Sequence, residues 1–226
     1  MQMLMSAYTH IWTSAYLHHT CHRCLKCDLL SPISREGTGK TTTAVHLAAG
    51  LGRHGRTLLV DADPQGSATE WTMLMEDERP FDLLTDSGEN LHRRIAEFGE
   101  GYAHIVIDTP PGHDAVVRSA ILSATDVLVP LAPSFMDINR LRPTIELIAS
   151  VEKLNAPSLR VLLTRVRPNT RMSRLARETL EELGVPVVES EIPLLEAYVT
   201  GFGLVPPDGH RYGAVLDELL REEVAA

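Results

Sequence analysis

The stretch SREGTGKTTT, residues 34–43, decides the fold. Its second half has what a phosphate-binding loop requires, because Gly39, Lys40 and Thr41 lead directly into an apolar run with helical character. Its first half departs from the common pattern G-x-x-x-x-G-K-[ST], since Ser34 stands where the pattern has its first glycine. The residues alone leave three interpretations open: a working site, a variant with its own rules, and a relic.

The loop has a specific chemistry if it works. Backbone N–H groups at the positive end of the following helix can surround phosphate oxygens. Lys40 would reach the β- and γ-phosphates, and the Thr41 hydroxyl would be a ligand of Mg²⁺. The residues expected to contact the phosphates are Gly37, Thr38, Gly39, Lys40, Thr41 and Thr42. The alternative is a flexible Gly/Thr turn that only caps a helix.

Strand and helix patterns alternate after residue 37, which predicts an α/β fold: a doubly wound, mostly parallel sheet with helices on both faces. Near-continuous apolar runs suit strands that are covered on both sides. The expected strands are 57–63, 103–112, 126–133, 159–166 and 185–193. The expected helices are 41–53, 91–98, 115–124, 138–154, 171–183 and 212–223, with Gly184 as a C-terminal cap.

Acidic residues follow two of the expected strands. Asp61 and Asp63 end the run TLLVDAD, and Asp108 ends AHIVID. Ligands bind at the carboxyl ends of strands in such sheets, and carboxylates there can hold Mg²⁺ directly or through water. We therefore expect Lys40, Asp63 and Asp108 to be catalytic and Thr41, Asp63 and Asp108 to hold the metal. The alternative for each acid is a capped turn.

Residues 1–34 differ from the rest of the chain and predict an atypical leader before a domain over 35–226. All three cysteines lie there, within CHRCLKC (21–27), so disulfides contribute nothing to the main domain. This stretch allows a zinc site, but no second spaced pair accompanies it, which favours a disordered or adventitious leader. The strand that should precede the loop is also missing, because Pro32 suits a central strand poorly.

The run GTGKTTTAVHLAAGLGRHGRTLLVDADPQGSATEW (37–71) resembles the ParA-type partition ATPases, within the deviant Walker A class that includes MinD. The resemblance extends from Gly37 to Leu220 and is nearest to short forms without an N-terminal DNA-reading domain, which include ATPases that position carboxysomes. The family motif is K-G-G-x-G-K-[ST]. Arg35 stands at its signature lysine and Glu36 at its first glycine, where a carboxylate would face phosphate.

The resemblance implies a cytoplasmic, nucleoid-associated ATPase that uses ATP and Mg²⁺. It implies a homodimer formed on ATP binding, non-specific DNA binding, and a ParB-like or cargo-adaptor protein that stimulates hydrolysis. Asp63 would help to place the attacking water and Asp108 would serve the Walker B role. Thr164 and the loop at 205–208, including Pro206, would frame the adenine.

Arginines cluster between Lys153 and Arg177, where the chain has no acidic residue although its net charge is −9. Three of them follow each other at intervals of three at the start of an expected helix, where they oppose the helix dipole. A role in contacting DNA phosphates would explain that cost, and the alternative is a solvated helix face. The residues expected to contact DNA are Arg165, Arg167, Arg171, Arg174 and Arg177.

Two roles known in this class are disfavoured. The C-terminal sequence LDELLREEVAA is acidic, whereas a membrane-binding tail would be basic and amphipathic, so we expect no membrane contact. An iron–sulfur ATPase needs cysteines in the domain body, which has none. A catalytically impaired ParA-fold protein that binds DNA without ATP turnover stays open. Because all departures lie before Gly37, we hypothesise that a frameshift or wrong start produced the leader.

Overall fold

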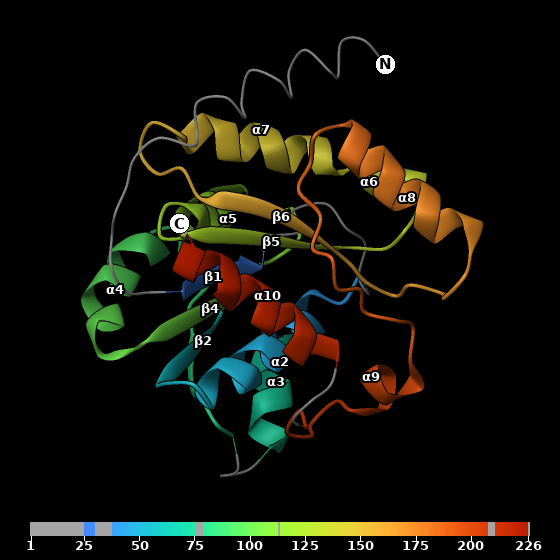
Figure 1. Cartoon of the computed structure of the whole chain (residues 1–226). Helices are drawn as coiled ribbons and strands as arrows, with labels where there is room; N and C mark the ends of the chain where they lie inside the picture. The colour runs from blue at the N-terminus through green and yellow to red at the C-terminus, as the bar shows by residue number, and fades with distance from the viewer. Residues whose placement is uncertain (1–24, 30–37, 76–78, 113, 208–210, 226) are drawn as a thin grey trace.

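Six parallel strands form the centre of the computed structural model, which describes residues 25–29, 38–75, 79–112, 114–207 and 211–225 (Figure 1). The strands lie in the order β3-β2-β4-β1-β5-β6, and every neighbouring pair is parallel. In chain order they are β1 (Leu25–Leu29), β2 (Thr57–Asp61), β3 (Asp82–Thr85), β4 (His104–Asp108), β5 (Asp126–Leu131) and β6 (Ser158–Leu163).

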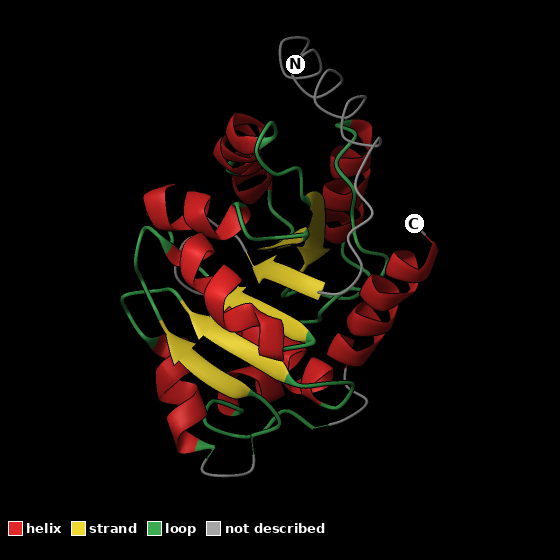
Figure 2. Cartoon of the chain, turned by 90° about the vertical axis from the view of Figure 1, so that its left-hand side faces the viewer, coloured by secondary structure: helices red, strands yellow, loops and turns green. Residues whose placement is uncertain are grey.

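Helices cover both faces of this sheet (Figure 2). The alternation of side chains along each strand produces the two faces, so Leu59 packs on one side and Leu58 and Val60 on the other. Helices α2 (Lys40–Gly52), α3 (Ser67–Leu74) and α10 (Arg211–Ala225) pack on the Leu59 side. The opposite face carries α4 (Leu91–Phe98), α5 (Asp114–Ile121), α6 (Phe135–Asn139), α7 (Leu141–Val151) and α8 (Arg171–Glu182). The remaining helices are η2 (Gly99–Gly101) and α9 (Glu196–Thr200).

The predicted α/β class is confirmed, and four of the expected strands correspond to β2, β4, β5 and β6. The expected cap is also confirmed, since Gly184 follows α8 with φ of 72°. One expected helix needs correction, because 138–154 is divided into α6 and α7. Strand β3 and helices α3 and α9 were not predicted.

The first strand is present, so its predicted absence was wrong. β1 lies between β4 and β5, and Leu25 to Leu29 pair in register with His104 to Asp108. Pro32 itself lies outside the described residues, and β1 covers Leu25–Leu29. β1 therefore lies inside the segment that composition sets apart as a leader. The supposed lack of a first strand therefore no longer supports the frameshift hypothesis. The cysteines of the zinc interpretation lie largely outside the described residues.

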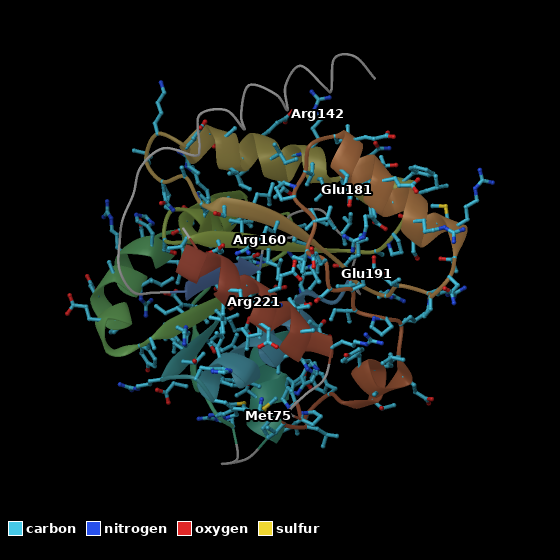
Figure 3. All side chains as sticks on the ribbon, viewed as in Figure 1. Met75, Arg142, Arg160, Glu181, Glu191 and Arg221 are labelled. Atoms are coloured by element: carbon cyan, nitrogen blue, oxygen red, sulfur yellow. The ribbon has the colours of Figure 1, made fainter. Side chains whose placement is uncertain are left out.

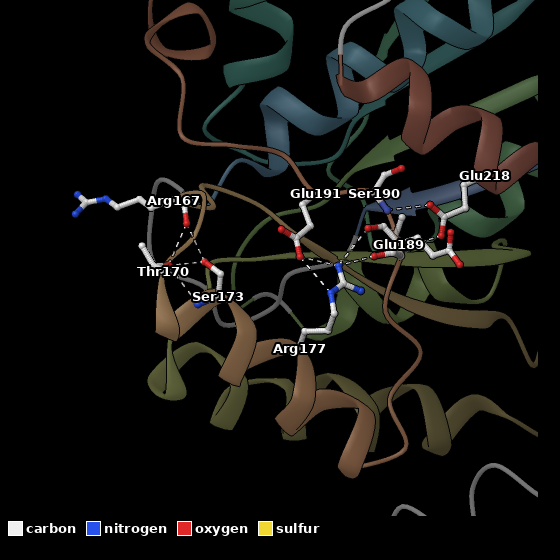
Figure 4. Close-up of polar contacts among 9 residues, drawn as sticks. Arg167, Thr170, Ser173, Arg177, Glu189, Ser190, Glu191 and Glu218 are labelled. Carbon is white, nitrogen blue, oxygen red and sulfur yellow. Dashed lines mark hydrogen bonds and ion pairs between the residues drawn. The ribbon is translucent and has the colours of Figure 1, made fainter.

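Residues 185–193 were expected to be a strand, but they do not form a regular one. They touch the sheet through two isolated bridges, Val161 to Val187 and Val166 to Pro193. Side chains from two helices hold the segment instead (Figure 4). The Arg177 guanidinium on α8 donates to Glu191 at 2.8 Å and to the Val188 carbonyl at 3.1 Å. From α10, the Glu218 carboxylate accepts hydrogen bonds from the backbone N–H groups of this segment.

Replacing Arg177 with methionine is expected to lower the free energy of unfolding by about 1–2 kcal/mol, because a charged donor to three acceptors is lost. The methionine keeps the apolar stem, so the change isolates the guanidinium. Arg174→Met, on the exposed side of the same helix, should change stability by no more than about 0.5 kcal/mol. Urea denaturation of the three proteins checks this, and equal stability of both variants would contradict a structural role for Arg177.

One ion pair lies inside the sheet itself. Arg160 on β6 contacts Asp126 on β5, and both side chains are nearly buried, with 12% and 11% exposure (Figure 3). Each charge thereby has an opposite charge beside it where little water reaches it. Arg160 is therefore part of the fold's internal packing, in contrast to the exposed arginines between β6 and α8.

Candidate functional site

The end of the phosphate loop lies where α2 begins. Gly39 precedes the helix with φ of 90° and ψ of 22°, a conformation that favours glycine. Among the described residues, no atom lies within 4 Å of a Cβ added at Gly39. No acidic residue lies in the first turn of α2. The positive end of the helix dipole is thus left available to an anion.

The predicted loop residues divide between the helix and the part that the structure does not describe. Lys40 is the first residue of α2 and is nearly buried, and Thr41 and Thr42 follow it in the first turn. Thr38 is buried just before them. Gly37, like Arg35 and Glu36, lies outside the described residues. The structure therefore supports the second half of the motif, and the departures in its first half stay a sequence observation.

The acids predicted from two separate strands lie side by side. Asp61 ends β2 and Asp108 ends β4, and the register of these neighbouring strands pairs the two residues directly. Both are buried, with exposures of 0% and 1%. Asp63 lies two residues beyond β2 and is partly exposed. The parallel sheet therefore brings the expected acids to the edge where α2 begins.

Asp108 is the most perturbed of these groups. The pKa of Asp108 is raised to about 7, mainly by burial and also by the negative charges of Asp61 and Asp63, although the nearby Thr41 hydroxyl and Lys40 ammonium act in the opposite direction. Neither carboxylate oxygen of Asp108 has a hydrogen-bond partner of good geometry among the described residues. Buried carboxylate oxygens without donors are costly, which is a common sign of a missing ligand.

This donor set fits Mg²⁺. A hydroxyl from Thr41 and carboxylates from Asp108 and Asp63 are the hard oxygen ligands that the ion prefers. Within the described parts of the chain, no three His, Cys, Asp or Glu side chains form a metal cage of their own. Mg²⁺ usually keeps several waters and is completed by substrate phosphates, so a sparse protein contribution agrees with that ion.

Asp61 has a structural task that the sequence did not reveal. Its carboxylate accepts hydrogen bonds from the Thr69 backbone N–H and hydroxyl, both at 2.7 Å, and from the Asp63 backbone N–H at 3.2 Å. It therefore fixes the turn that carries Asp63 to the start of α3. Asp63 in turn accepts from the Gln65 backbone N–H at 2.9 Å. The sequence offers no signal for this, because Thr69 is one of many threonines.

The two residues expected to frame adenine lie in different places. Thr164 follows β6, is buried, and donates its hydroxyl to the Thr38 carbonyl at 2.9 Å. Pro206 lies beside the C-terminal end of α2. Its carbonyl accepts from the guanidinium of Arg53, the cap of that helix end, at 2.8 Å. Its place at the adenine stays a prediction.

The predicted arginines also separate into two kinds. Arg165 and Arg167 lie between β6 and α8, and Arg171 and Arg174 lie in the first turns of α8; all four are exposed. We call these four residues the arginine surface. The Thr170 hydroxyl caps α8 by accepting a hydrogen bond from the Ser173 N–H, so the helix begins at Arg171. Arg177 differs, because Glu191 and backbone carbonyls occupy its guanidinium.

A cluster of one histidine and two tyrosine rings lies between α2 and α10 and was not predicted. The Thr43 and Tyr212 hydroxyls are hydrogen bonded at 2.9 Å, which joins α2 to α10. His46, one turn further along α2, stacks on Tyr212 with ring centroids 4.6 Å apart and meets Tyr198 edge-on at 5.3 Å. These contacts join residues far apart in sequence, so no local pattern could predict them.

Comparison with known proteins agrees with the geometry. Residues 34–201 match the CobQ/CobB/MinD/ParA nucleotide binding domain. The chain belongs to this family. Among curated relatives, Maintenance of carboxysome distribution protein A from Gloeobacter kilaueensis is 42% identical over 164 residues, which cover 72% of this chain and 74% of that protein. The sporulation initiation inhibitor protein Soj of Bacillus subtilis is 26% identical, with 84% and 94% covered.

Solved structures of the ParA-type family confirm the fold. Apo McdA from Cyanothece superposes with a TM-score of 0.73 at 22% identity, covering 87% of this chain and 99% of that one. A putative plasmid partition protein from Borrelia burgdorferi bound to AMPPNP also has a TM-score of 0.73, at 20% identity, covering 87% and 98%. The predicted resemblance to ParA-type P-loop ATPases is therefore confirmed. In the described residues, no helix combines the length and apolarity needed to cross a membrane.

Proposed function

We propose that this ParA-type protein is a Mg²⁺-dependent ATPase that dimerises on ATP and binds DNA non-specifically to position a cargo. The observation that carries the proposal is the buried Asp108 carboxylate beside Lys40 and Thr41 at the N-terminus of α2, since neither of its oxygens has a donor of good geometry among the described residues. ATP with Mg²⁺ supplies what this arrangement lacks: a cation for the carboxylate and an anion for the helix.

The chain's own residues would share the work as follows. Lys40 and the N–H groups of the first turn of α2 bind the phosphates, and Thr41 with Asp108 holds the ion. Asp63, kept in place by Asp61, orients the attacking water. Hydrolysis would be slow until a second protomer and a stimulating partner protein complete the site.

The names of the relatives support a cargo of a particular kind. The 42% identical protein is named for carboxysome distribution, and Soj and ParA relatives are named for sporulation and chromosome partitioning. Carboxysomes or a comparable protein cargo are the proposed load, with a cargo-adaptor or ParB-like protein as the partner. Nucleoid association in the cytoplasm would follow from the DNA binding.

Nucleotide-dependent DNA binding tests the proposal. Affinity for a random-sequence duplex is measured with ATPγS and Mg²⁺, with ADP, and without nucleotide, while light scattering reports the oligomeric state. We expect tight binding and a dimer only with ATPγS. Binding that is indifferent to nucleotide would instead support the impaired protein, which Glu36 in the loop favours.

The arginine surface should carry the DNA contact. Arg171→Ala with Arg174→Ala should weaken duplex binding equally for unrelated sequences. The slope of log affinity against log salt should fall by about 2 for each protomer that contacts the duplex, since each lost phosphate contact removes about 0.9. Arg93→Ala with Arg221→Ala, exposed on α4 and α10, is the matched control. An unchanged slope in the first variant, or an equal change in both, would exclude this surface.

A further inference from the structure

Thr164 joins two functional parts of the molecule that lie far apart in sequence. Its buried hydroxyl donates to the Thr38 carbonyl across 126 residues. Thr38 belongs to the phosphate loop, while Thr164 directly precedes Arg165, the first member of the arginine surface. The contact therefore connects the nucleotide site with the segment proposed to meet DNA.

The direction of this hydrogen bond matters for phosphate binding. In a trans peptide the C=O and the N–H point in opposite directions. Because the Thr38 carbonyl points toward Thr164, the Gly39 N–H of the same peptide points away from it. This N–H stands at the N-terminus of α2, where helix N–H groups have no intrahelical acceptor. The Thr164 hydroxyl thus orients a donor for an anion.

The backbone around Thr164 is fixed on both sides. The Thr164 N–H donates to the Leu131 carbonyl on β5 at 2.9 Å, and the Val166 N–H donates to Ile192 at 3.0 Å. Between them Arg165 has φ of 54°, a left-handed conformation that costs a non-glycine residue energy. The neighbouring backbone has little freedom to adjust. If the Thr164 backbone moves, we therefore expect Arg165, the next residue, to move with it.

We propose that Thr164 is a positioning residue that holds the 38–39 peptide for phosphate binding and couples the loop to the arginine surface. This inference rests on the proposed function and gives Thr164 a different task from contact with adenine. A hydroxyl that orients the loop acts on any polyphosphate, whereas an adenine contact acts only on nucleotides that carry the base. Coupling is reciprocal, so DNA should also strengthen polyphosphate binding through the same bond.

The test compares Thr164→Val, which keeps the shape and loses the hydroxyl, with Thr164→Ser, which keeps the hydroxyl. Affinities are measured for Mg²⁺-ATP and for inorganic tripolyphosphate, which has no base. We expect Thr164→Val to weaken both by the same factor, about 3- to 10-fold, the worth of one hydrogen bond. Thr164→Ser should stay within about twofold of wild type.

Different outcomes overturn different statements. Loss of ATP binding alone would assign Thr164 to the adenine, and equal loss in both variants would assign it to packing; either result overturns the inference. If wild type binds both ligands and Thr164→Val binds them equally well, the inference fails while the proposed function stands. If wild type binds neither, the proposed function fails as well.

Two further measurements complete the design. In Thr164→Val, the factor by which ATPγS raises duplex affinity should fall by a similar amount, and an unchanged factor would overturn the coupling. Hydrogen exchange at residues 38–43 should become faster in Thr164→Val without nucleotide, and unchanged exchange would show that the bond does not order the loop. Should Thr164→Val fail to fold, Thr164→Ala replaces it in every comparison.

Discussion

Replacing Asp108 with asparagine is expected to slow ATP hydrolysis about 100- to 1,000-fold while it stabilises the nucleotide-free protein at pH 8. Hydrolysis falls because the amide is a poor ligand for Mg²⁺ and carries no charge to bind the ion. Stability rises because the native carboxylate is buried and has no donor of good geometry among the described residues. The same replacement therefore has opposite effects on activity and on the free energy of unfolding.

The pH dependence has a definite sign. The pKa of Asp108 is about 7 in the folded protein, against an ordinary value of 3.8, so the folded state holds this proton more tightly than the unfolded state does. The stability from the protonated carboxyl is present at low pH and is lost as the pH rises through 7. Asparagine does not titrate. The free energy of unfolding of Asp108→Asn should therefore increase relative to that of wild type between about pH 4 and pH 7, by at most about 4 kcal/mol.

Thermal unfolding from pH 5 to pH 8 in the presence of a chelator, together with phosphate release, checks this prediction. Asp126→Asn is the contrasting control, because Asp126 is paired with Arg160 and its replacement leaves that cation nearly buried and unpaired. This control should be less stable at both pH values. An Asp108→Asn protein that is less stable than wild type at pH 8, or that hydrolyses ATP normally, would refute the assignment.

Removing the Lys40 ammonium should abolish nucleotide binding. Lys40→Ala is expected to weaken the binding of a fluorescent ATP analogue with Mg²⁺ by about 100-fold, because a nearly buried cation that would pair with the phosphates is lost. Equilibrium titration of wild type and variant measures the effect. Lys153→Ala, at an exposed position after α7, is the matched control and should bind as wild type does.

The two possible results have different meanings for the unusual loop. Micromolar binding that is lost in Lys40→Ala would show that the residues up to Thr41 suffice, despite Arg35 and Glu36. Equal, weak binding by wild type and variant would show that the loop no longer holds nucleotide. The chain would then have a ParA fold without ParA chemistry, and Glu36→Gly would be the replacement most expected to restore binding.

Much of the fold could be predicted from the sequence, because its signals are local. Buried parallel strands read as apolar runs, and the acids that end two of them, Asp61 and Asp108, indicated which edge of the sheet would matter. The glycine, lysine and threonine that open α2 were recognisable for the same reason. Each of these features depends on residues that are adjacent in sequence.

The remainder depends on contacts between distant residues. β3 has only four residues and a mixed burial pattern, so its period is weak. Residues 185–193 look like a strand by composition, yet Arg177 and Glu218 hold them against the helices. Thr164 was expected at the adenine, and only the folded chain shows that its hydroxyl reaches Thr38.

The position of β1 has a consequence for any shortened version of the chain. β1 is the only strand between β4 and β5, so the sheet without it would separate into β3-β2-β4 and β5-β6. Each half would expose a new row of unpaired N–H and C=O groups, and such edges promote aggregation. A start site placed after residue 29 would thus remove the strand that joins the two halves of the sheet. Insoluble protein from such a gene would indicate the loss of this strand and would say nothing about the ATP site.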